Sequence, residues 1–167
     1  SIGAYNNPDA EEREFFFIND DGSYLCWAGV ETMPALNYGS EKLRDIIYRD
    51  ENSVLKKYLK APFNIDGWRF DVADVMARNE KQNVYYEVWE EIYQEIKKTN
   101  KDALILAEEW QDATEMYNGK RWDSTMNYFA SELPIREFSG EKDVFTARHP
   151  ELSKIDYYFD ADQLKNR

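Results

Sequence analysis

Apolar residues recur every four positions between residues 79 and 100, which is the spacing of one face of an α-helix. The repeating residues are Val84, Val88, Ile92 and Ile96. Lysines at 97 and 98 end the segment, where positive charge suits the helix dipole. We therefore expect one long helix over residues 79–100.

Two shorter helical patterns come before this helix. The first follows Ser40, a candidate N-cap, and runs to the polar stretch 49–52. The second runs from Val54 to Leu59 and ends at Ala61–Pro62, because the residue before a proline avoids the α conformation. We expect two short helices before the first strand of a sheet.

The segment from Trp68 to Val72 alternates in a way that predicts a β-strand. Successive side chains of a strand point to opposite faces, so Trp68, Phe70 and Val72 share one face. The other face carries Arg69 and Asp71, which lie within reach of each other. An arginine beside a carboxylate keeps that carboxylate ionised. The pair is therefore either a structural ion pair or an oriented nucleophile with its partner.

Two more strands are predicted farther along the chain. Residues 103–107 are a continuous apolar run, as in a parallel strand buried on both faces, and residues 122–128 are expected to form the third strand. Residues 111–118 between them predict one or two helical turns. The alternation of helices and strands predicts an α/β fold with a parallel sheet and right-handed crossovers.

The first 39 residues carry no clear helix or strand period. Turn-forming residues surround two short apolar runs, 15–18 and 24–27, which are candidates for small strands. A loop-rich segment of this length is usually functional or disordered, and its aromatic content favours order. We expect residues 1–39 to form an insertion and residues 40–167 to form βα units.

Composition narrows the functional classes. The 167 residues suffice for one domain with a core, and the net charge of −12 argues against nucleic acid and anionic membranes as partners. No apolar run approaches the ~18 residues of a membrane span, and the N-terminal residues do not resemble a signal peptide. Cys26 is the only cysteine, so no internal disulfide forms, and we expect a cytoplasmic location. The 16% aromatic content suits sugar stacking as well as core packing.

Two carboxyl groups follow the first two predicted strands. Ligands of parallel sheets bind at the carboxyl ends of the strands, where Asp71 and Glu108 both stand. Retaining glycoside hydrolysis uses two carboxyls about 5–5.5 Å apart, one ionised to attack and one protonated to donate. Asp71, beside Arg69, suits the attacking role. Glu108 follows an apolar strand and precedes Trp110, surroundings that favour a protonated carboxyl.

Several separated motifs, in the expected order, resemble the α-amylase family of glycoside hydrolases. Residues 67–73 (GWRFDVA) resemble its nucleophile motif, and residues 106–110 (LAEEW) resemble its acid/base motif. Residues 33–37 (MPALN) resemble a motif of the neopullulanase, cyclomaltodextrinase and maltogenic amylase branch. Residues 47–53 and 59–64 resemble the maltodextrin glucosidases of that branch. The resemblance covers essentially the whole chain.

The resemblance implies a role for individual residues. It makes Asp71 the nucleophile, Glu108 the acid/base and Arg69 the residue that holds Asp71. The residues expected to contact sugar are Trp68, Trp110 and Asn127. Glu109 stands where the family usually has an apolar residue, so the choice of acid/base between Glu108 and Glu109 stays open.

The chain departs from the family pattern at several positions. Ala35 replaces a lysine of the branch motif, Ala107 replaces a common glycine, and Asp74–Val75 replaces the usual pair after the nucleophile motif. These positions shape the sugar subsites beyond the cleavage point. The preference between α-1,4 and α-1,6 bonds, and among maltodextrins, cyclodextrins and pullulan, therefore stays open.

The chain is shorter than the fold that the resemblance implies. A TIM (β/α)8 barrel usually needs about 250 residues, and two family motifs, Asp-x-x-x-Asn-His and His-Asp, are missing. We expect a partial barrel from the third βα loop, where residues 1–39 form a domain B-like insertion, through the sixth strand to a helix near Asp160. His149 is interpreted as an ordinary surface residue. Because its strand edges would be open, we expect the chain by itself to show negligible hydrolysis and to self-associate.

Two other functions fit part of the pattern. A non-catalytic carbohydrate-binding domain would use the aromatic residues, and a transglycosylase would share the fold. We expect an α-glucan oligosaccharide as the partner, with no cofactor and no metal, because Asp66, Asp71 and Asp74 need not converge. No glycine-rich loop precedes a helix, so phosphate binding has no support.

Overall fold

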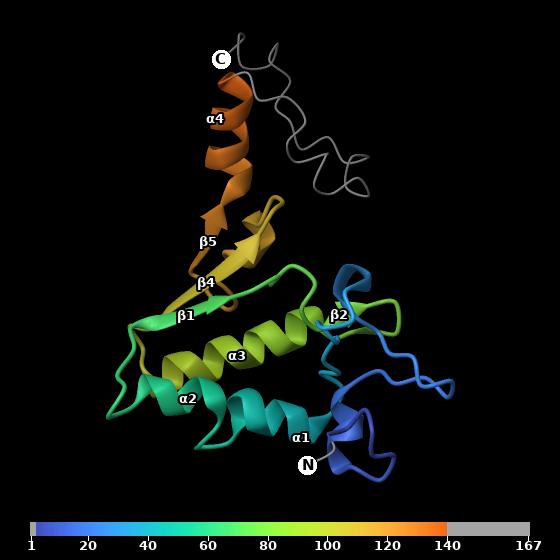
Figure 1. Ribbon diagram of the computed structural model, residues 1–167. Helices are drawn as coiled ribbons and strands as arrows, with labels where there is room; N and C mark the ends of the chain where they lie inside the picture. Colours follow the sequence, from blue (N-terminus) through green and yellow to red (C-terminus); the bar gives the residue numbers. More distant parts are fainter. Residues whose placement is uncertain (1–2, 140–167) are drawn as a thin grey trace.

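Three parallel strands, in the order β1–β4–β5, form the centre of the molecule (Figure 1). The computed structural model describes residues 3–139. The strands are β1 (Gly67–Phe70), β2 (Arg78–Asn79), β3 (Gln82–Asn83), β4 (Leu104–Glu109) and β5 (Ser124–Asn127). The helices are η1 (Glu11–Phe15), η2 (Trp27–Gly29), α1 (Glu41–Arg44), η3 (Asp45–Arg49), α2 (Val54–Leu59), α3 (Tyr85–Thr99), η4 (Thr114–Met116), η5 (Tyr128–Glu132) and α4 (Leu133–Phe138).

The register of the sheet brings the carboxyl ends of all three strands to one edge. β1 pairs in parallel with β4, which places Phe70 opposite Ala107. β4 pairs in parallel with β5, which places Glu108 opposite Met126. Gly67 lies so close to Leu104 that a Cβ at this position would clash with the backbone of Leu104. The parallel sheet predicted from the order of elements is confirmed.

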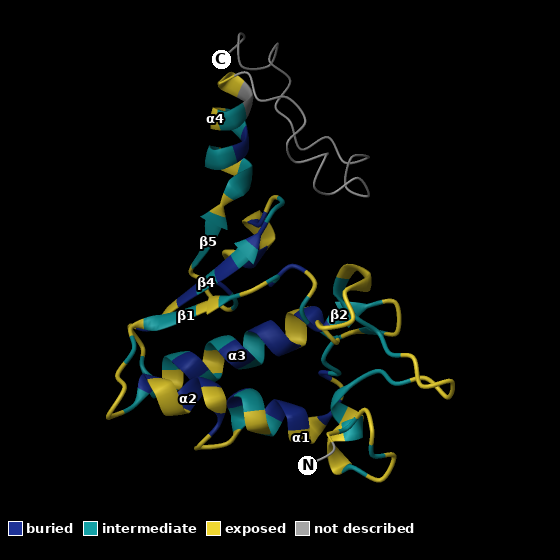
Figure 2. Cartoon of the chain, viewed as in Figure 1, coloured by how far each residue is buried: buried dark blue, intermediate teal, exposed yellow. Residues whose placement is uncertain are grey.

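Helices cover one face of the sheet and leave the other open (Figures 1 and 2). α3 lies under β1 and β4, with α1 and α2 beside it. Trp89 of α3 is fully buried, and the rings of Phe70 and Trp122 meet it edge to face at 5.0 and 5.3 Å. The other buried residues of α3 are Tyr85, Val88, Ile92 and Ile96. The predicted fourfold apolar period is thus the core-facing side of this helix, except that Val84 lies just before it.

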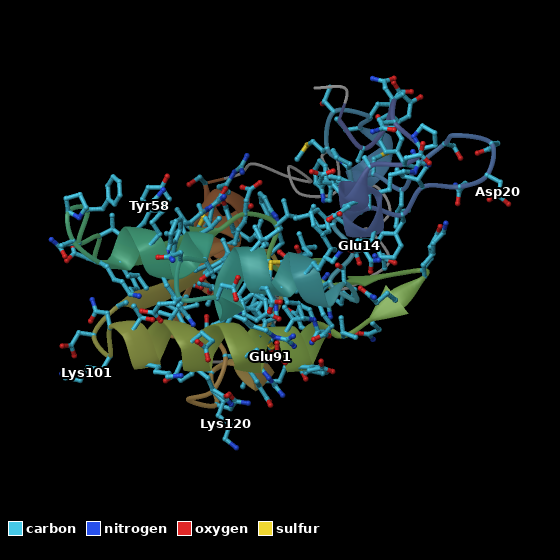
Figure 3. The ribbon with its side chains drawn as sticks, turned by 90° about the horizontal axis from the view of Figure 1, so that it is seen from below. Glu14, Asp20, Tyr58, Glu91, Lys101 and Lys120 are labelled. Atoms are coloured by element: carbon cyan, nitrogen blue, oxygen red, sulfur yellow. The ribbon has the colours of Figure 1, made fainter. Side chains whose placement is uncertain are left out.

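Charged side chains join the helices to one another (Figure 3). Glu91 of α3 accepts hydrogen bonds from the Tyr48 hydroxyl at 2.6 Å and from Arg49 Nη2 at 2.8 Å. Nearby, the almost fully buried Arg44 pairs with Glu87. A buried cation needs such a partner, and these contacts fix α1 and η3 against α3.

The long helix begins six residues later than the periodicity predicts. α3 starts at Tyr85, because residues 78–83 form the β2–β3 hairpin instead of a helical turn. The side-chain oxygen of Asn79 accepts hydrogen bonds from the backbone N–H groups of Lys81 and Gln82, and so closes the hairpin turn. Asparagine is favoured in such turns because its side chain bonds the backbone two residues on.

Two other expectations need correction. The strand predicted to reach Val72 ends at Phe70, and Val72 has a positive φ of 47°, so its side chain does not continue the alternation. The runs 15–18 and 24–27 do not form regular strands in residues 3–39. They make isolated bridges, in which Ile18 meets Tyr24 and Cys26 meets Pro34.

Residues 111–118 contain one short helix, η4, and residues 122–128 contain β5, as predicted. His149 and the helix near Asp160 lie outside the described residues. Within residues 3–139, no helix is both long and apolar enough to cross a membrane.

Candidate active site

One guanidinium holds two carboxylates at the carboxyl end of the sheet. Arg69 Nη1 is paired with Asp71 Oδ1, and Arg69 Nη2 lies 3.0 Å from Glu108 Oε2. Asp71 follows β1, whereas Glu108 lies near the end of the neighbouring strand β4. The three residues expected to be catalytic are therefore gathered in one place. The Asp71 side chain is 64% exposed and that of Glu108 only 12%, so Asp71 is the more accessible carboxylate.

The loop after β1 is fastened directly to the end of β4. The Val72 N–H donates to Glu108 Oε2 at 2.8 Å, and the Ala73 N–H donates to the Glu108 carbonyl at 3.1 Å. Glu108 thus binds this loop through its backbone as well as its side chain. These bonds set the position of Asp71, which immediately precedes Val72.

Met126 is a neighbour of the site that the sequence analysis did not single out. Its sulfur lies 3.4 Å from both Nε and Nη2 of Arg69, close enough for weak hydrogen bonds. Met126 pairs with Glu108 in the sheet register, so its side chain emerges on the same face as Glu108. Alternation along the strand predicted over residues 122–128 could have indicated Met126. It puts the Met126 side chain on the same face as Ser124 and on the opposite face from Asn127.

The apolar surroundings expected for Glu108 are found around Glu109. Adjacent residues of a strand point to opposite faces, so Glu108 faces Arg69 on the open side and Glu109 faces the helix layer. Glu109 is 6% exposed, and burial raises its pKa to about 7, with the charge of Asp74 acting in the same direction. Environment therefore favours Glu109 as the protonated carboxyl, whereas contact with Arg69 favours Glu108 as the partner of Asp71.

Trp68 does not lie beside the two carboxylates. Its indole N–H donates to the Leu55 carbonyl at 3.1 Å, and its ring packs edge to face on Tyr58 at 5.8 Å. Both contacts are with residues of α2, on the helix-covered side of the sheet. The expectation that Trp68 contacts sugar has no geometric support, because the strand alternation turns it away from Asp71.

Trp110 follows β4 and Asn127 ends β5, so both lie on the carboxyl side of the sheet, nearer to Glu108 than Trp68 does. Trp110 is stacked on Tyr128 with ring centroids 4.0 Å apart and planes at 14°. The side-chain oxygen of Asn127 accepts a hydrogen bond from the Ala130 N–H at 3.1 Å and so caps η5. The two residues hold the segment after β5 in place, and their roles toward sugar remain predictions.

A groove of about 620 Å³ opens on the Asp71 side of the site. Its walls come from residues 25–28, 33–36 and 38 of the N-terminal part and from residues 71–72 and 75–79 after β1. Ala35 and Val75, two departures from the family pattern, are among the lining residues. Asp71 lines the groove and Glu108 does not, so the groove meets the carboxylate pair on the side of Asp71.

No group of three or more histidine, cysteine or acidic side chains within residues 3–139 is arranged to hold a metal ion. Asp71 is paired with Arg69, and Asp74 is buried behind it, so the two carboxylates are not available to one ion together.

The buried Glu109 carboxyl is expected to make the folded chain less stable as the pH rises. Its pKa is about 7 when folded and 4.5 without the burial, so the folded chain binds this proton more tightly. The stabilisation that Glu109 contributes is therefore full below about pH 4.5 and is lost by about pH 7, a change of roughly 3 kcal/mol. Urea unfolding measured across this range should show the loss, and Glu109→Gln should flatten it. An equally steep loss in the variant would contradict this assignment.

The sequence matches the family described as "Alpha amylase, catalytic domain" over residues 10–165. Neopullulanase 2 of Thermoactinomyces vulgaris is 41% identical over 134 residues, which cover 76% of this chain and 21% of that protein. The amylopullulanase of Thermoanaerobacterium thermosulfurigenes is 30% identical over 143 residues, which cover 76% of this chain and 7% of that protein. The chain therefore spans about a fifth or less of these relatives.

Solved structures agree on the fold. The acarbose-soaked debranching enzyme of Nostoc punctiforme is 27% identical with a TM-score of 0.61, over 75% of this chain and 26% of that one. A cyclomaltodextrinase, at 23% identity and a TM-score of 0.65 over 82% of this chain and 23% of that one, supports the fold alone. The match over residues 10–165 shows that this chain belongs to the alpha-amylase family and represents part of its catalytic domain.

Proposed function

We propose that this chain is part of a retaining glycoside hydrolase that cleaves α-glucosidic bonds in maltodextrins, cyclodextrins or pullulan. The observation that carries the proposal is the single Arg69 guanidinium that holds both Asp71 and Glu108 where two adjacent parallel strands end. Relatives named neopullulanase, cyclomaltodextrinase and amylopullulanase support this substrate class. The bond cleaved is α-1,4 or α-1,6.

The two carboxyls act in turn on one bond. The Asp71 carboxylate attacks the anomeric carbon and forms a glycosyl ester, while protonated Glu108 gives its proton to the departing glycosidic oxygen. Glu108, now ionised, takes a proton from water, and that water displaces Asp71 from the sugar. Two inversions at the same carbon leave the α configuration unchanged. The ion pair with Arg69 orients Asp71 between turnovers.

The groove beside Asp71 is the proposed binding region for sugar units beyond the cleaved bond. It is lined by the two walls described above, and Ala35 and Val75 replace family residues there. Their shorter or uncharged side chains leave the groove apolar at these points. This lining is the proposed determinant of substrate specificity.

The match to the alpha-amylase catalytic domain over residues 10–165 supports a proposal for the extent of the fold. We propose that the chain covers a TIM barrel from the third βα loop through the sixth strand, with residues 1–39 as a domain B-like insertion. β1 and β5 each have one unpaired edge in the three-stranded sheet of the described residues, and the remaining strands of a barrel would cover both edges. Alone, the 167-residue chain is expected to show negligible hydrolysis.

The test is the configuration of the first product. A protein that carries these residues within a complete barrel is mixed with maltotriose, and the reducing sugar is followed by proton NMR before it mutarotates. The α-anomer is the expected first product, and transfer products in place of free sugar would indicate a transglycosylase. Release of the β-anomer would refute the retaining mechanism. Full-rate hydrolysis by the 167-residue chain alone would refute the partial barrel.

A further inference from the structure

A hydrogen bond between two side-chain amides joins the two walls of the groove beside Asp71. Gln82 Nε2, in the β2–β3 hairpin, donates to Asn37 Oδ1, in the N-terminal segment, at 3.1 Å. The two residues are 45 positions apart in the sequence, and the hairpin lies beside the N-terminal segment (Figure 1). We call this bond the amide bridge.

The Asn37 end of the amide bridge is held in one orientation. Asn37 Nδ2 donates to the Glu14 carbonyl at 2.9 Å, and Asn37 Oδ1 also accepts a hydrogen bond from the Gly39 N–H at 3.0 Å. The backbone N–H of Asn37 donates to the Phe15 carbonyl at 2.8 Å. Because Nδ2 is bound to Glu14, the amide cannot turn over, and its oxygen is the atom presented to the hairpin.

Gln82 occupies its end of the amide bridge at a cost in stability. The Gln82 Oε1 atom is buried and has no hydrogen-bond partner. Burying such an oxygen costs free energy, which an apolar side chain would avoid. The Gln82 side chain supplies the bond from Nε2 to Asn37 instead. Positioning of the hairpin therefore explains this residue better than stability does.

Gly39 leaves room for the amide bridge. A Cβ at this position would overlap with Gln82 Nε2 and would lie 3.0 Å from Asn37 Oδ1. Gly39 is not among the glycines with a positive φ, so it is needed here for space and not for its conformation. Since Nε2 is the far end of a flexible side chain, an alanine at position 39 would displace the Gln82 amide and leave the backbone in place.

The residues beside the amide bridge line the groove. Leu36 and Tyr38, on either side of Asn37, belong to one wall. Asn79, which pairs with Gln82 in the hairpin, belongs to the other. Asn37 and Gln82 are not lining residues themselves, so the amide bridge holds the walls without filling the space between them.

A second bond joins the same two segments at the surface. Lys81 Nζ donates to Asn19 Oδ1, and both residues are exposed. Neither residue lines the groove. Exposed side chains exchange such bonds readily for bonds to water, so this contact fixes little. The partly buried amide bridge is therefore the contact that sets the distance between the walls.

We propose that Asn37 and Gln82 are positioning residues that set the width of the groove, and so decide how tightly it holds the sugar units of an α-glucan beyond the cleaved bond. This inference rests on the proposed function, which takes the groove as the binding region for those units. The groove volume of about 620 Å³ lies within the range of roughly 300–1,000 Å³ that is typical of ligand pockets. Without the amide bridge, sugar binding must also order the two walls, and that cost lowers the affinity.

Binding of a long and a short sugar tests the amide bridge. The protein used carries these residues within a complete barrel and also carries Asp71→Asn, so that the sugar is not hydrolysed. Isothermal titration should show that Gln82→Ala weakens maltoheptaose binding at least about tenfold. Binding of an aryl α-glucoside, which has one sugar unit and does not extend beyond the cleaved bond, should change less than about twofold. Unchanged maltoheptaose binding, or an equal loss for both ligands, would overturn the proposal.

Glu80→Gln is the matched control for this experiment. Glu80 lies at the exposed tip of the same hairpin, so its replacement should change neither affinity. A loss of maltoheptaose binding in Glu80→Gln as large as that in Gln82→Ala would overturn the role of the amide bridge.

Gly39→Ala separates loss of the amide bridge from general damage to the hairpin. It should weaken maltoheptaose binding about as much as Gln82→Ala does. The double variant should bind no more weakly than Gln82→Ala alone, because the side chain that the added methyl group would displace is absent. Losses that multiply in the double variant would overturn the proposal. A protein that hydrolyses maltotriose but fails these binding tests would refute the amide bridge and leave the proposed function intact.

Discussion

Asp71→Asn is expected to abolish turnover of α-glucans by a protein that carries these residues within a complete barrel. The amide is nearly the same size as the carboxylate but is a far weaker nucleophile, so the glycosyl ester does not form. We expect kcat to fall at least about 10³-fold with little change in substrate affinity. The matched control is Asp66→Asn, at the exposed opposite end of β1, which should keep its activity.

The same assay decides between the adjacent glutamates. Glu108→Gln should lower kcat about 10²- to 10⁴-fold for substrates with a poor leaving group and less for an activated aryl glucoside, as expected when a general acid is lost. Glu109→Gln should retain turnover, because Glu109 faces the helix layer. If Glu109→Gln shows the leaving-group dependence and Glu108→Gln does not, the assignment of the acid/base is wrong.

Turnover, rather than substrate affinity, separates the enzyme from a sugar-binding module. A non-catalytic module would bind maltodextrin and show no turnover to lose, whereas an enzyme would still bind the sugar after Asp71→Asn or Glu108→Gln. Isothermal titration with the inactive variants should therefore report binding close to that of the unchanged protein. Undetectable turnover in the unchanged protein would favour the module.

The sheet and its carboxylates could be predicted because they depend on local pattern and simple topology. The alternation at Trp68 and Phe70 fixes which side chains face the helices, and the apolar run at 103–107 marks a central parallel strand. Parallel strands then bring Asp71 and Glu108 to the same edge. None of these steps needs a contact between distant residues.

The end of β1 could not be predicted, because a distant contact determines it. Val72 is β-branched and adopts a positive φ, which such a residue rarely does. Its N–H donates to the side chain of Glu108, 36 positions away, and this bond accompanies the turn that lifts Asp71 out of the strand. A pattern within residues 68–72 carries no information about that bond.

The surroundings of Glu108 and Glu109 are a second feature that could not be predicted from the sequence. The two glutamates are adjacent in sequence, yet one meets Arg69 and the other is buried with a pKa of about 7. Which of them is buried depends on which face α3 covers. The start of α3 was also mispredicted, since the turn formed by Asn79 has no helical period to reveal it.

Trp89→Ala is expected to cost the 167-residue chain about 3–5 kcal/mol of unfolding free energy, a large part of the stability of a domain. Trp89 is fully buried and contacts the rings of Phe70 and Trp122, so it joins α3 to β1 and to the segment before β5. Its loss would leave a cavity directly beneath the strand that carries Arg69. Urea unfolding followed by circular dichroism measures the change.

Trp89→Phe is the matched control for this change. The buried indole N–H of Trp89 has no hydrogen-bond partner, so phenylalanine keeps an aromatic ring against Phe70 and Trp122 while removing a polar group that costs free energy to bury. We expect Trp89→Phe to be clearly less destabilising than Trp89→Ala. Equal losses would show that the full indole volume is required. A loss below about 1 kcal/mol for Trp89→Ala would show that the helix layer does not support β1 through this ring. The position of Arg69 between Asp71 and Glu108 would then depend on the bonds between Glu108 and the loop after β1.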